Sequence, residues 1–155
     1  MLMLLFRVGN QHYALDTAPV LEIVPMVILR KLSHAPEYMA GVFSFQGQVI
    51  PVLDLSHRIQ GIPSRISLST RIILLQLPYL NHGKCLLGLI AEHVTETLKQ
   101  SPSNLVESGY QSSDAPFLGK MIVNQENLIQ CIEVNHLLSP QEQDNLLIAL
   151  EGSPL

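Results

Sequence analysis

The sequence predicts a mainly β protein built from two copies of one small β unit. Two kinds of observation lead there: short apolar runs rich in β-branched residues and separated by turn residues, and a pattern that occurs twice. The pattern reads GVFSFQGQVIPVLDLSHRI at residues 41–59 and GKMIVNQENLIQCIEVNHLL at residues 119–138. Aligning Ile50 with Ile129 places Asp54 on Glu133, and His57 then falls on His136.

A second pair of similar segments lies upstream in the same order. YALDTAPVLEI at residues 13–23 matches LGLIAEHVTET at residues 87–97, which places Leu15 on Leu89 and Glu22 on Glu96. Two matches in one order indicate an internal duplication. We therefore expect a single domain over residues 1–155. It contains two intertwined halves, approximately 1–66 and 67–138, followed by a C-terminal helix over 139–152.

Apolar runs and turn residues define the elements of the first half. Residues 2–8 are expected to form a strand, and residues 9–11 turn the chain into a second strand from 13 to about 23. Residues 36–40 can form one helical turn with proline near its start. Residues 49–55 indicate a buried strand, in which Pro51 favours an edge or a bulge. Ser56 is a good N-cap for a short helix.

The second half follows a loop over residues 61–69. Residues 70–77 predict a strand buried on both faces, 78–84 a hairpin loop, and 85–90 another strand. Residues 99–116 form the longest irregular segment, and 121–123 with 128–134 predict a hairpin. Ser139-Pro140-Gln141-Glu142 fits a capping box that opens the C-terminal helix. Its apolar face would comprise Leu146, Leu147 and Leu150, and Gly152 would end it.

Composition excludes several classes of protein. The chain is 47% hydrophobic and 14% charged, which supplies a packed core and argues against disorder. Its net charge is −4 without any run of Lys or Arg, which argues against nucleic-acid binding. No run approaches the ~18 apolar residues that a membrane span needs, and Arg7 interrupts the apolar start too early for a signal peptide. Cys85 and Cys131 indicate buried free thiols in a reducing cytosol, so we expect a cytoplasmic protein without direct membrane insertion.

The sequence carries no catalytic or metal-binding motif. None of the six histidines lies in H-E-x-x-H, and Cys-x-x-Cys, a P-loop, G-x-G-x-x-G and G-x-S-x-G do not occur. His57 and His136 fit helix starts better than ligand positions, because no clustered partner accompanies them. Asp54 and Glu133 are more simply one structural position that occurs twice. We therefore expect no catalytic residue, no metal and no cofactor.

Four segments carry a family resemblance: FRVGNQHYAL, VLEIVP at residues 20–25, GVFSFQGQVIPVLDL, and LGLIAEHVTET. Within residues 4–138 and in this order, they resemble the CheW-like family of chemotaxis coupling proteins, which includes the regulatory domain of the kinase CheA. The third segment is the most distinctive, because it resembles G-V-x-N-L-R-G-x-[VI]-[VI]-P-V-[VI]-[DN]-L. The resemblance implies two SH3-like five-stranded β-barrels with a pseudo-twofold relation around a shared core.

The resemblance also implies a function and two contact sites. It implies a non-catalytic scaffold that couples a methyl-accepting chemoreceptor's cytoplasmic tip to a CheA-like histidine kinase regulatory domain. Kinase contacts are expected near Leu4, Thr17 and Val20. Receptor contacts are expected near Glu22, Gly41 and Gln46, in a groove between the barrels. Structure alone could also explain Glu22, since Glu96 occupies the same place in the repeat.

Two features near the third segment bear on receptor binding. Phe43 and Phe45 alternate around Ser44 and share one face of a strand. They are either core residues or a partly exposed aromatic anchor for the receptor. The family's arginine is replaced here by Gln46, which keeps hydrogen bonding but loses the charge. The V-D pair of the family is likewise Ala91-Glu92 in this chain.

Three other functions remain open from the sequence. The chain could be a divergent paralogue in another signalling pathway, a small-ligand-binding β-barrel sensor with a pocket between its halves, or a small enzyme. An exposed apolar strand edge favours the scaffold, whereas a closed, deep pocket with convergent polar groups favours the sensor.

Overall fold

The computed structural model describes residues 1–79, 83–125 and 127–151. Its elements follow the chain in this order: β1 (Leu2–Val8), β2 (Gln11–Asp16), β3 (Val20–Pro25), β4 (Met39–Phe45), β5 (Gln48–Asp54), α1 (Leu55–Gln60), β6 (Arg71–Tyr79), β7 (Gly83–Lys99), the 3-10 turn η1 (Pro102–Asn104), β8 (Leu105–Val106), β9 (Leu118–Asn124), β10 (Asn127–Ile132), the 3-10 turn η2 (Val134–His136) and α2 (Pro140–Glu151).

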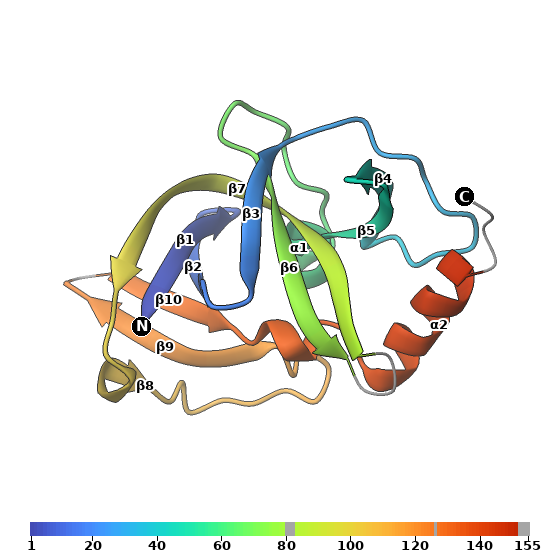
Figure 1. Cartoon of the computed structure of the whole chain (residues 1–155). Helices are drawn as coiled ribbons and strands as arrows, with labels where there is room; N and C mark the ends of the chain where they lie inside the picture. The colour runs from blue at the N-terminus through green and yellow to red at the C-terminus, as the bar shows by residue number, and fades with distance from the viewer. Residues whose placement is uncertain (80–82, 126, 152–155) are drawn as a thin grey trace.

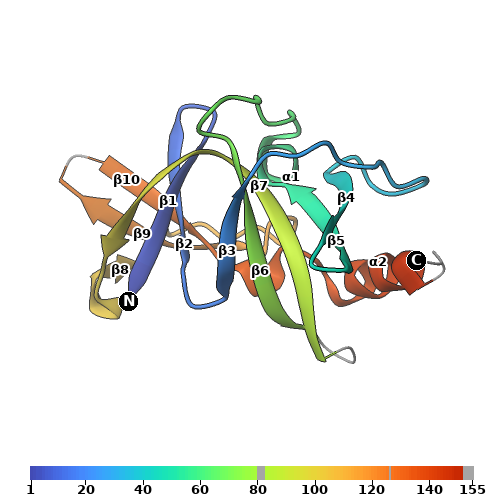
Figure 2. The ribbon, with the colours of Figure 1, turned by 45° about the horizontal axis from the view of Figure 1, so that its top comes forward.

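The strands form two five-stranded barrels that share the long strand β7 (Figures 1 and 2). We call them the β1 barrel, with strand order β7-β1-β2-β10-β9, and the β6 barrel, with strand order β3-β6-β7-β5-β4. Residues 83–91 of β7 pair with β6, and its later residues pair with β1. His93 adopts φ 52° where the strand passes from one barrel to the other. The expected two-barrel, mainly β architecture is confirmed.

The strand registers reproduce the sequence repeat. Val52 lies opposite Gly88 where β5 runs parallel to β7, and Cys131 lies opposite Ala14 where β10 runs parallel to β2. The halves also exchange strands, because β3 pairs with β6 while the end of β7 pairs with β1. The division of the halves near residue 66 stays a prediction.

Apolar side chains fill three clusters. One fills the β1 barrel, comprising Met3, Ala14, Ile122, Ile129 and Cys131, and another fills the β6 barrel around Val52, Ile72 and Ile90. The largest cluster draws on both barrels, α1 and α2, and includes Phe6, Leu15, Leu53, Leu55 and Leu89. This third cluster is the shared core that joins the barrels.

Two segments before residue 41 depart from expectation. The strand expected over residues 13–23 is two strands, since β2 ends at Asp16 and β3 starts at Val20 in the other barrel. The turn between them contains Pro19, which has no N–H to donate to a ladder. The helical turn expected at residues 36–40 is also wrong. Residues 36–39 form a non-helical turn, closed by a hydrogen bond from Met39 N to Pro36 O at 3.0 Å, and β4 begins at Met39.

Helix α1 begins two residues earlier than expected, so Ser56 is not its N-cap. Asp54 is the N-cap, and its Oδ1 accepts from the backbone N–H groups of Ser56 and His57 at 3.1 and 3.4 Å. Ser64 adds two further bonds to the same carboxylate. Glu133 occupies the equivalent position before η2 but makes no side-chain cap bond. One position of the repeat therefore has two different roles.

The second half contains the expected strands with different bounds. Strand β10 ends at Ile132, two residues before its expected end, and the segment expected to be irregular contains η1 and β8. Strand β7 extends to Lys99 instead of ending near residue 90, and β6 extends to Tyr79, while residues 80–82 of the expected loop lie outside the described residues. The capping box of α2 is confirmed: Ser139 N donates to Glu142 Oε1 at 2.9 Å, and Glu142 N donates to Ser139 Oγ at 3.1 Å. The side chains of Leu147 and Leu150, and all of Gly152, lie outside the described part of the chain.

Candidate functional site

Three of the predicted receptor residues line one surface hollow. Glu22, Phe45 and Gln46 surround a space of about 390 Å³, together with Leu21, Gln48, Leu74, Gln76, Lys84 and Leu86. We call this space the β6 hollow. All of its lining residues come from strands of the β6 barrel or from the β4–β5 turn. These three residues therefore meet at one end of the β6 barrel, and their hollow is lined by that barrel alone, whereas a groove between the two barrels was expected.

Strand alternation explains why the hollow is apolar below and polar at its rim. Side chains two apart on a strand share a face. On β6, the face that carries Ile72 inside the barrel continues through Leu74 to Gln76 at the hollow. On β7, the face that carries Ile90 inside the barrel reaches the hollow at Leu86 and Lys84. The hollow is thus the outward continuation of the barrel interior.

The β4–β5 turn fixes the position of Gln46 at the rim. The two turn residues, Gln46 and Gly47, both have positive φ, at 49° and 80°. Two-residue hairpin turns of this kind match the twist of the flanking strands. Gln46 is exposed and lines the hollow, so its amide is available to a partner.

The sequence left open whether Phe43 and Phe45 are core residues or a partly exposed anchor, and the structure gives the two residues different surroundings. Their rings share one face of β4, with centroids 6.3 Å apart and planes tilted by 60°. Phe43 packs against the interior cluster of the β6 barrel, whereas Phe45 lines the hollow. Phe43 is therefore a core residue, and Phe45 is the aromatic side chain that a partner can reach.

Gly41 is buried and has a structural role. Its φ is +148°, and a Cβ there would lie 2.5 Å from the carbonyl oxygen of Arg30. The backbones of Arg30 and Val42 exchange two hydrogen bonds, at 2.9 and 2.8 Å, beside this glycine. Gly41 therefore permits a close approach of two backbone segments and is not among the residues that line the hollow; its expected receptor contact stays a prediction.

The predicted kinase residues do not form one surface. Leu4 is only 3% exposed and packs in the shared core, so its side chain is not available as a surface contact. Thr17 and Val20 flank the β2–β3 turn, where Thr17 N and Oγ1 both donate to Leu2 O at 3.0 Å. Val20 is half-buried against the shared core. Of these three residues, Thr17 and Val20 are partly accessible and Leu4 is not.

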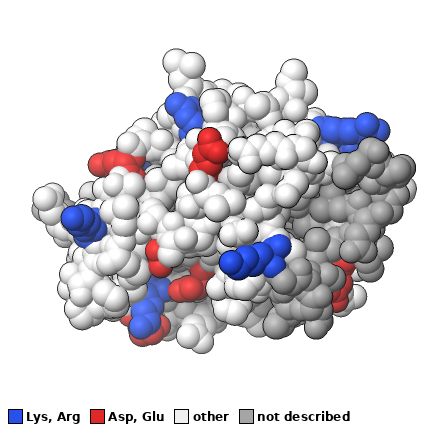
Figure 3. Space-filling model, in the orientation of Figure 1, with Lys and Arg blue, Asp and Glu red and all other residues white. Residues whose placement is uncertain are grey.

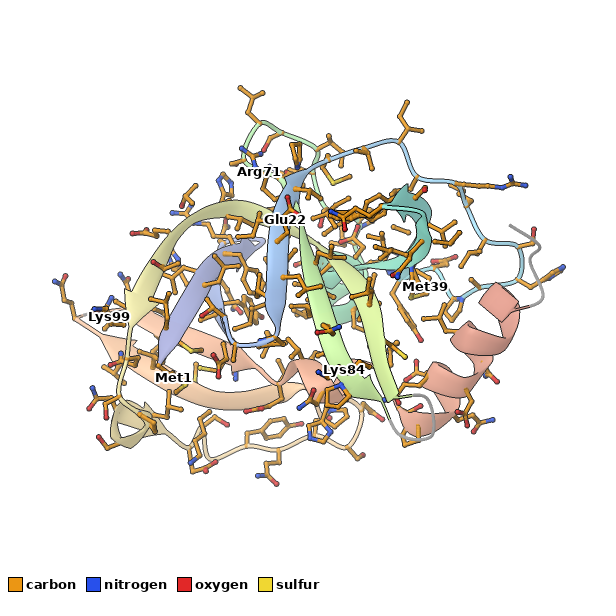
Figure 4. All side chains as sticks on the ribbon, in the orientation of Figure 1. Met1, Glu22, Met39, Arg71, Lys84 and Lys99 are labelled. Atoms are coloured by element: carbon orange, nitrogen blue, oxygen red, sulfur yellow. The ribbon has the colours of Figure 1, made fainter. Side chains whose placement is uncertain are left out.

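Sequence reasoning missed several residues of these surfaces. Leu21 and Lys84 belong to the hollow, and Leu2 lies exposed beside Thr17. Figure 4 labels Glu22 and Lys84, and Figure 3 shows the same face, on which an uncharged surface separates an acidic group from a basic group at these two places. The alternation of side chains along β7, continued back from Leu86 to the start of the strand, would have identified Lys84 as a residue on the same face.

A polar cluster joins helix α2 to the first half. Arg58 Nη2 donates to Glu142 Oε1 at 3.1 Å, Arg58 Nε donates to Leu137 O at 3.1 Å, and Tyr38 OH donates to Glu142 Oε2. The Arg58 guanidinium also lies 4.4 Å from the Tyr38 ring centroid. A second hollow, of about 230 Å³, lies between residues 32–39 and α2. We call Tyr38, Arg58 and Glu142 the α2 clamp.

Ionisation of the clamp follows from these contacts. Burial opposes the charge on Glu142, but the bonds from Tyr38 and Ser139 and the charge of Arg58 outweigh it and lower the pKa of the carboxyl below its ordinary 4.5. Burial and the bond to Glu142 raise the pKa of Tyr38. The clamp therefore contains a carboxylate, a guanidinium and a neutral phenol at neutral pH.

Neither cysteine forms a disulfide, as expected. Burial, with a contribution from the charge of Glu133, raises the pKa of Cys131 to about 11, and burial also raises the pKa of Cys85. Among the described residues, no group of three or more His, Cys, Asp or Glu could hold a metal ion. The described helices include none with the length and apolarity needed to cross a membrane.

Comparison with known proteins gives consistent matches over most of the chain. The CheW-like domain family matches residues 2–142. The probable chemotaxis protein CheW of Rhizobium etli is 26% identical over 141 residues, which cover 90% of this chain and 88% of the relative. The chemotaxis protein CheW of Klebsiella aerogenes is 21% identical over 141 residues, covering 90% and 82%.

A solved structure has the same fold. The scaffolding protein TtCheW from Thermoanaerobacter tengcongensis superposes with a TM-score of 0.77 at 24% identity, covering 89% of this chain and 87% of that chain. This likeness shows that the β1 and β6 barrels have the two-barrel, SH3-like arrangement of that protein.

Proposed function

This chain belongs to the CheW-like domain family, and we propose that it is a non-catalytic adaptor coupling chemoreceptors to a CheA-type histidine kinase in bacterial chemosensory signalling. Its relatives carry the name chemotaxis protein, and its structural neighbour is named a scaffolding protein. An adaptor acts by recognition, so that receptor state changes kinase activity through a coupling free energy and without chemistry of its own.

One observation carries the assignment of the receptor site: Glu22, Phe45 and Gln46, which are distant in sequence, line one hollow. Its apolar floor and exposed polar rim suit a protein partner, because interfaces combine a buried apolar centre with a polar rim. Its exposed rim residues make it an open surface, so the closed pocket expected of a small-ligand sensor is not favoured.

The kinase site is proposed at the β2–β3 turn, through Thr17 and Val20. Val20 and Glu22 lie two residues apart on β3, so one strand connects the two proposed sites. An interface on the turn and an interface in the hollow would both constrain that strand. We place the protein in the cytoplasm, where receptor tips and the kinase are accessible to it, and we propose no cofactor.

The test is a pair of titrations of the full chain, one with a soluble receptor cytoplasmic fragment and one with the kinase regulatory domain. Glu22→Lys should weaken receptor binding and leave kinase binding unchanged. Thr17→Arg should do the reverse, because its bulk lies at the turn and outside the hollow. Wild-type protein that binds neither partner would contradict the proposed function. Two variants that each lose both partners would contradict the placement of the sites.

A further inference from the structure

The β6 hollow contains one basic side chain among its lining residues. Lys84 lies at the start of β7, opposite Pro78 of β6, and its side chain is exposed. The other polar residues of the hollow are Glu22 and the three glutamines Gln46, Gln48 and Gln76. Glutamine amides both donate and accept hydrogen bonds, so they impose no preference for a charged partner. Charge preference in the hollow therefore depends on Lys84 and Glu22.

Neither of these two charges is neutralised within the described part of the chain. The ion pairs there join His57 to Glu37, Arg58 to Glu142 and Lys120 to Glu107. Lys84 and Glu22 mark two separate places on one face, with uncharged surface between them (Figures 3 and 4). The hollow is also lined by four apolar side chains, Leu21, Phe45, Leu74 and Leu86, of which Leu74 is buried and Leu21 is exposed.

From this arrangement we infer that Lys84 is the charge anchor of the hollow and selects a partner segment that places a carboxylate beside an apolar side chain. The inference rests on the proposed function and names the chemistry of its receptor site. Gln46, in the β4–β5 turn, provides no charge, whereas Lys84, on β7, provides a basic group in the same hollow. The specificity of this chain thus depends on β7 as well as on the β4–β5 turn.

The occupant that fits is an α-helical segment of the receptor tip. Residues three or four apart on a helix lie on one face, so a Glu or Asp can meet Lys84 while a neighbouring apolar side chain enters the hollow over Phe45. A basic group elsewhere on that helix can face Glu22. Opposite charges placed in this way fix the orientation of the helix and raise the rate of association.

The test compares Lys84→Gln with Lys99→Gln, because both lysines are exposed and lie at the two ends of the same strand. The full chain is titrated with a receptor cytoplasmic fragment at low salt and at about 1 M salt, where screening is nearly complete. Lys84→Gln should raise the Kd about two- to fivefold at low salt, as for an exposed ion pair, and Lys99→Gln should not. Lys84→Glu should raise it further. A receptor variant with lysine in place of the contacting acid should restore binding to Lys84→Glu.

Several outcomes overturn the inference. One is an equal Kd for Lys84→Gln and Lys99→Gln at low salt. Another is a loss of affinity that persists unchanged at high salt. A third is a loss of binding to the kinase regulatory domain instead of the receptor, which would assign the hollow to the kinase. Wild-type chain that binds no receptor fragment would refute the proposed function itself. Thermal melting of each variant separates these outcomes from misfolding.

Discussion

Replacing Glu142 by Gln should loosen helix α2 from the rest of the molecule. The carboxylate accepts from Tyr38 OH, Arg58 Nη2 and Ser139 N, so it links the helix to a turn and a helix of the first half. Glutamine keeps the length of the side chain and can still serve in a capping box. The substitution therefore removes the charge while it leaves the local helix signal in place.

The magnitude follows from the two contacts that depend on charge. Hydrogen bonds to charged groups contribute about 1.5–3 kcal/mol, against about 1 kcal/mol for neutral ones. Weakening the bonds to Tyr38 and Arg58 should therefore cost about 1–2 kcal/mol of unfolding free energy. For a chain of this length, about 2–4 °C of Tm is lost per kcal/mol, which gives a decrease of about 2–8 °C.

The assay is thermal and urea unfolding followed by circular dichroism, with Glu107→Gln as the matched control. Glu107 pairs with Lys120 at 3.7 Å, but both side chains are at least half exposed, so its loss should cost less than about 0.5 kcal/mol. Equal destabilisation by the two substitutions would refute the reasoning. A cost for Glu142→Gln that persists in the Arg58→Met, Tyr38→Phe background would also refute it.

The effect should also depend on pH in a defined direction. Because folding lowers the pKa of Glu142 below its ordinary 4.5, its stabilisation is complete above that value. It is lost as the pH falls through the lower folded-state pKa. The difference in Tm between wild type and Glu142→Gln should therefore shrink in acid. A difference that grows as the pH falls would contradict the assigned ionisation.

Three further predictions concern other parts of the chain. Gln46→Arg should strengthen receptor binding by on the order of 1 kcal/mol, which lowers the Kd a few-fold to tenfold. The gain should be smaller at higher salt, and kinase binding should be unchanged. The absence of any gain would mean a different partner or a different site. Asp54→Ala should lower the unfolding free energy measured in urea by about 1–3 kcal/mol because it removes an N-cap, whereas Glu133→Ala at the equivalent position should lower it little. Equal losses of unfolding free energy would contradict the difference in capping. Native thiol labelling should modify Cys85 before Cys131, and the mass of untreated protein should show no loss of two hydrogens.

The internal repeat predicted more of the fold than local patterns did. The pairs Leu15 with Leu89 and Val52 with Cys131 anticipated the strand registers, because duplicated sequences keep equivalent positions in a sheet. Local patterns failed where tertiary context decides. The apolar run through residues 13–23 does not reveal that the chain leaves one barrel for the other at the turn before Val20.

The candidate site was predicted in part. Glu22, Phe45 and Gln46 meet because their strands are neighbours at one end of the β6 barrel. Leu4 was misplaced, because β1 lies between the β1 barrel interior and the shared core, and alternation cannot distinguish a strand covered on both faces from a surface strand. Lys84 was missed because its strand was expected to start at residue 85, two residues after its actual start at Gly83.

The exchange of β3 and the end of β7 between the halves determines how the molecule can come apart. Opening the β6 barrel removes β3 from β6, and opening the β1 barrel removes the last residues of β7 from β1. In each case the two strands that separate come from different halves of the chain, because β3 and β1 belong to the first half and β6 and β7 to the second. Neither barrel can therefore stay closed alone. We expect a single cooperative unfolding transition, without a state that keeps one barrel intact. An expressed fragment of residues 1–66 should therefore fold only when the remainder of the chain is supplied to it.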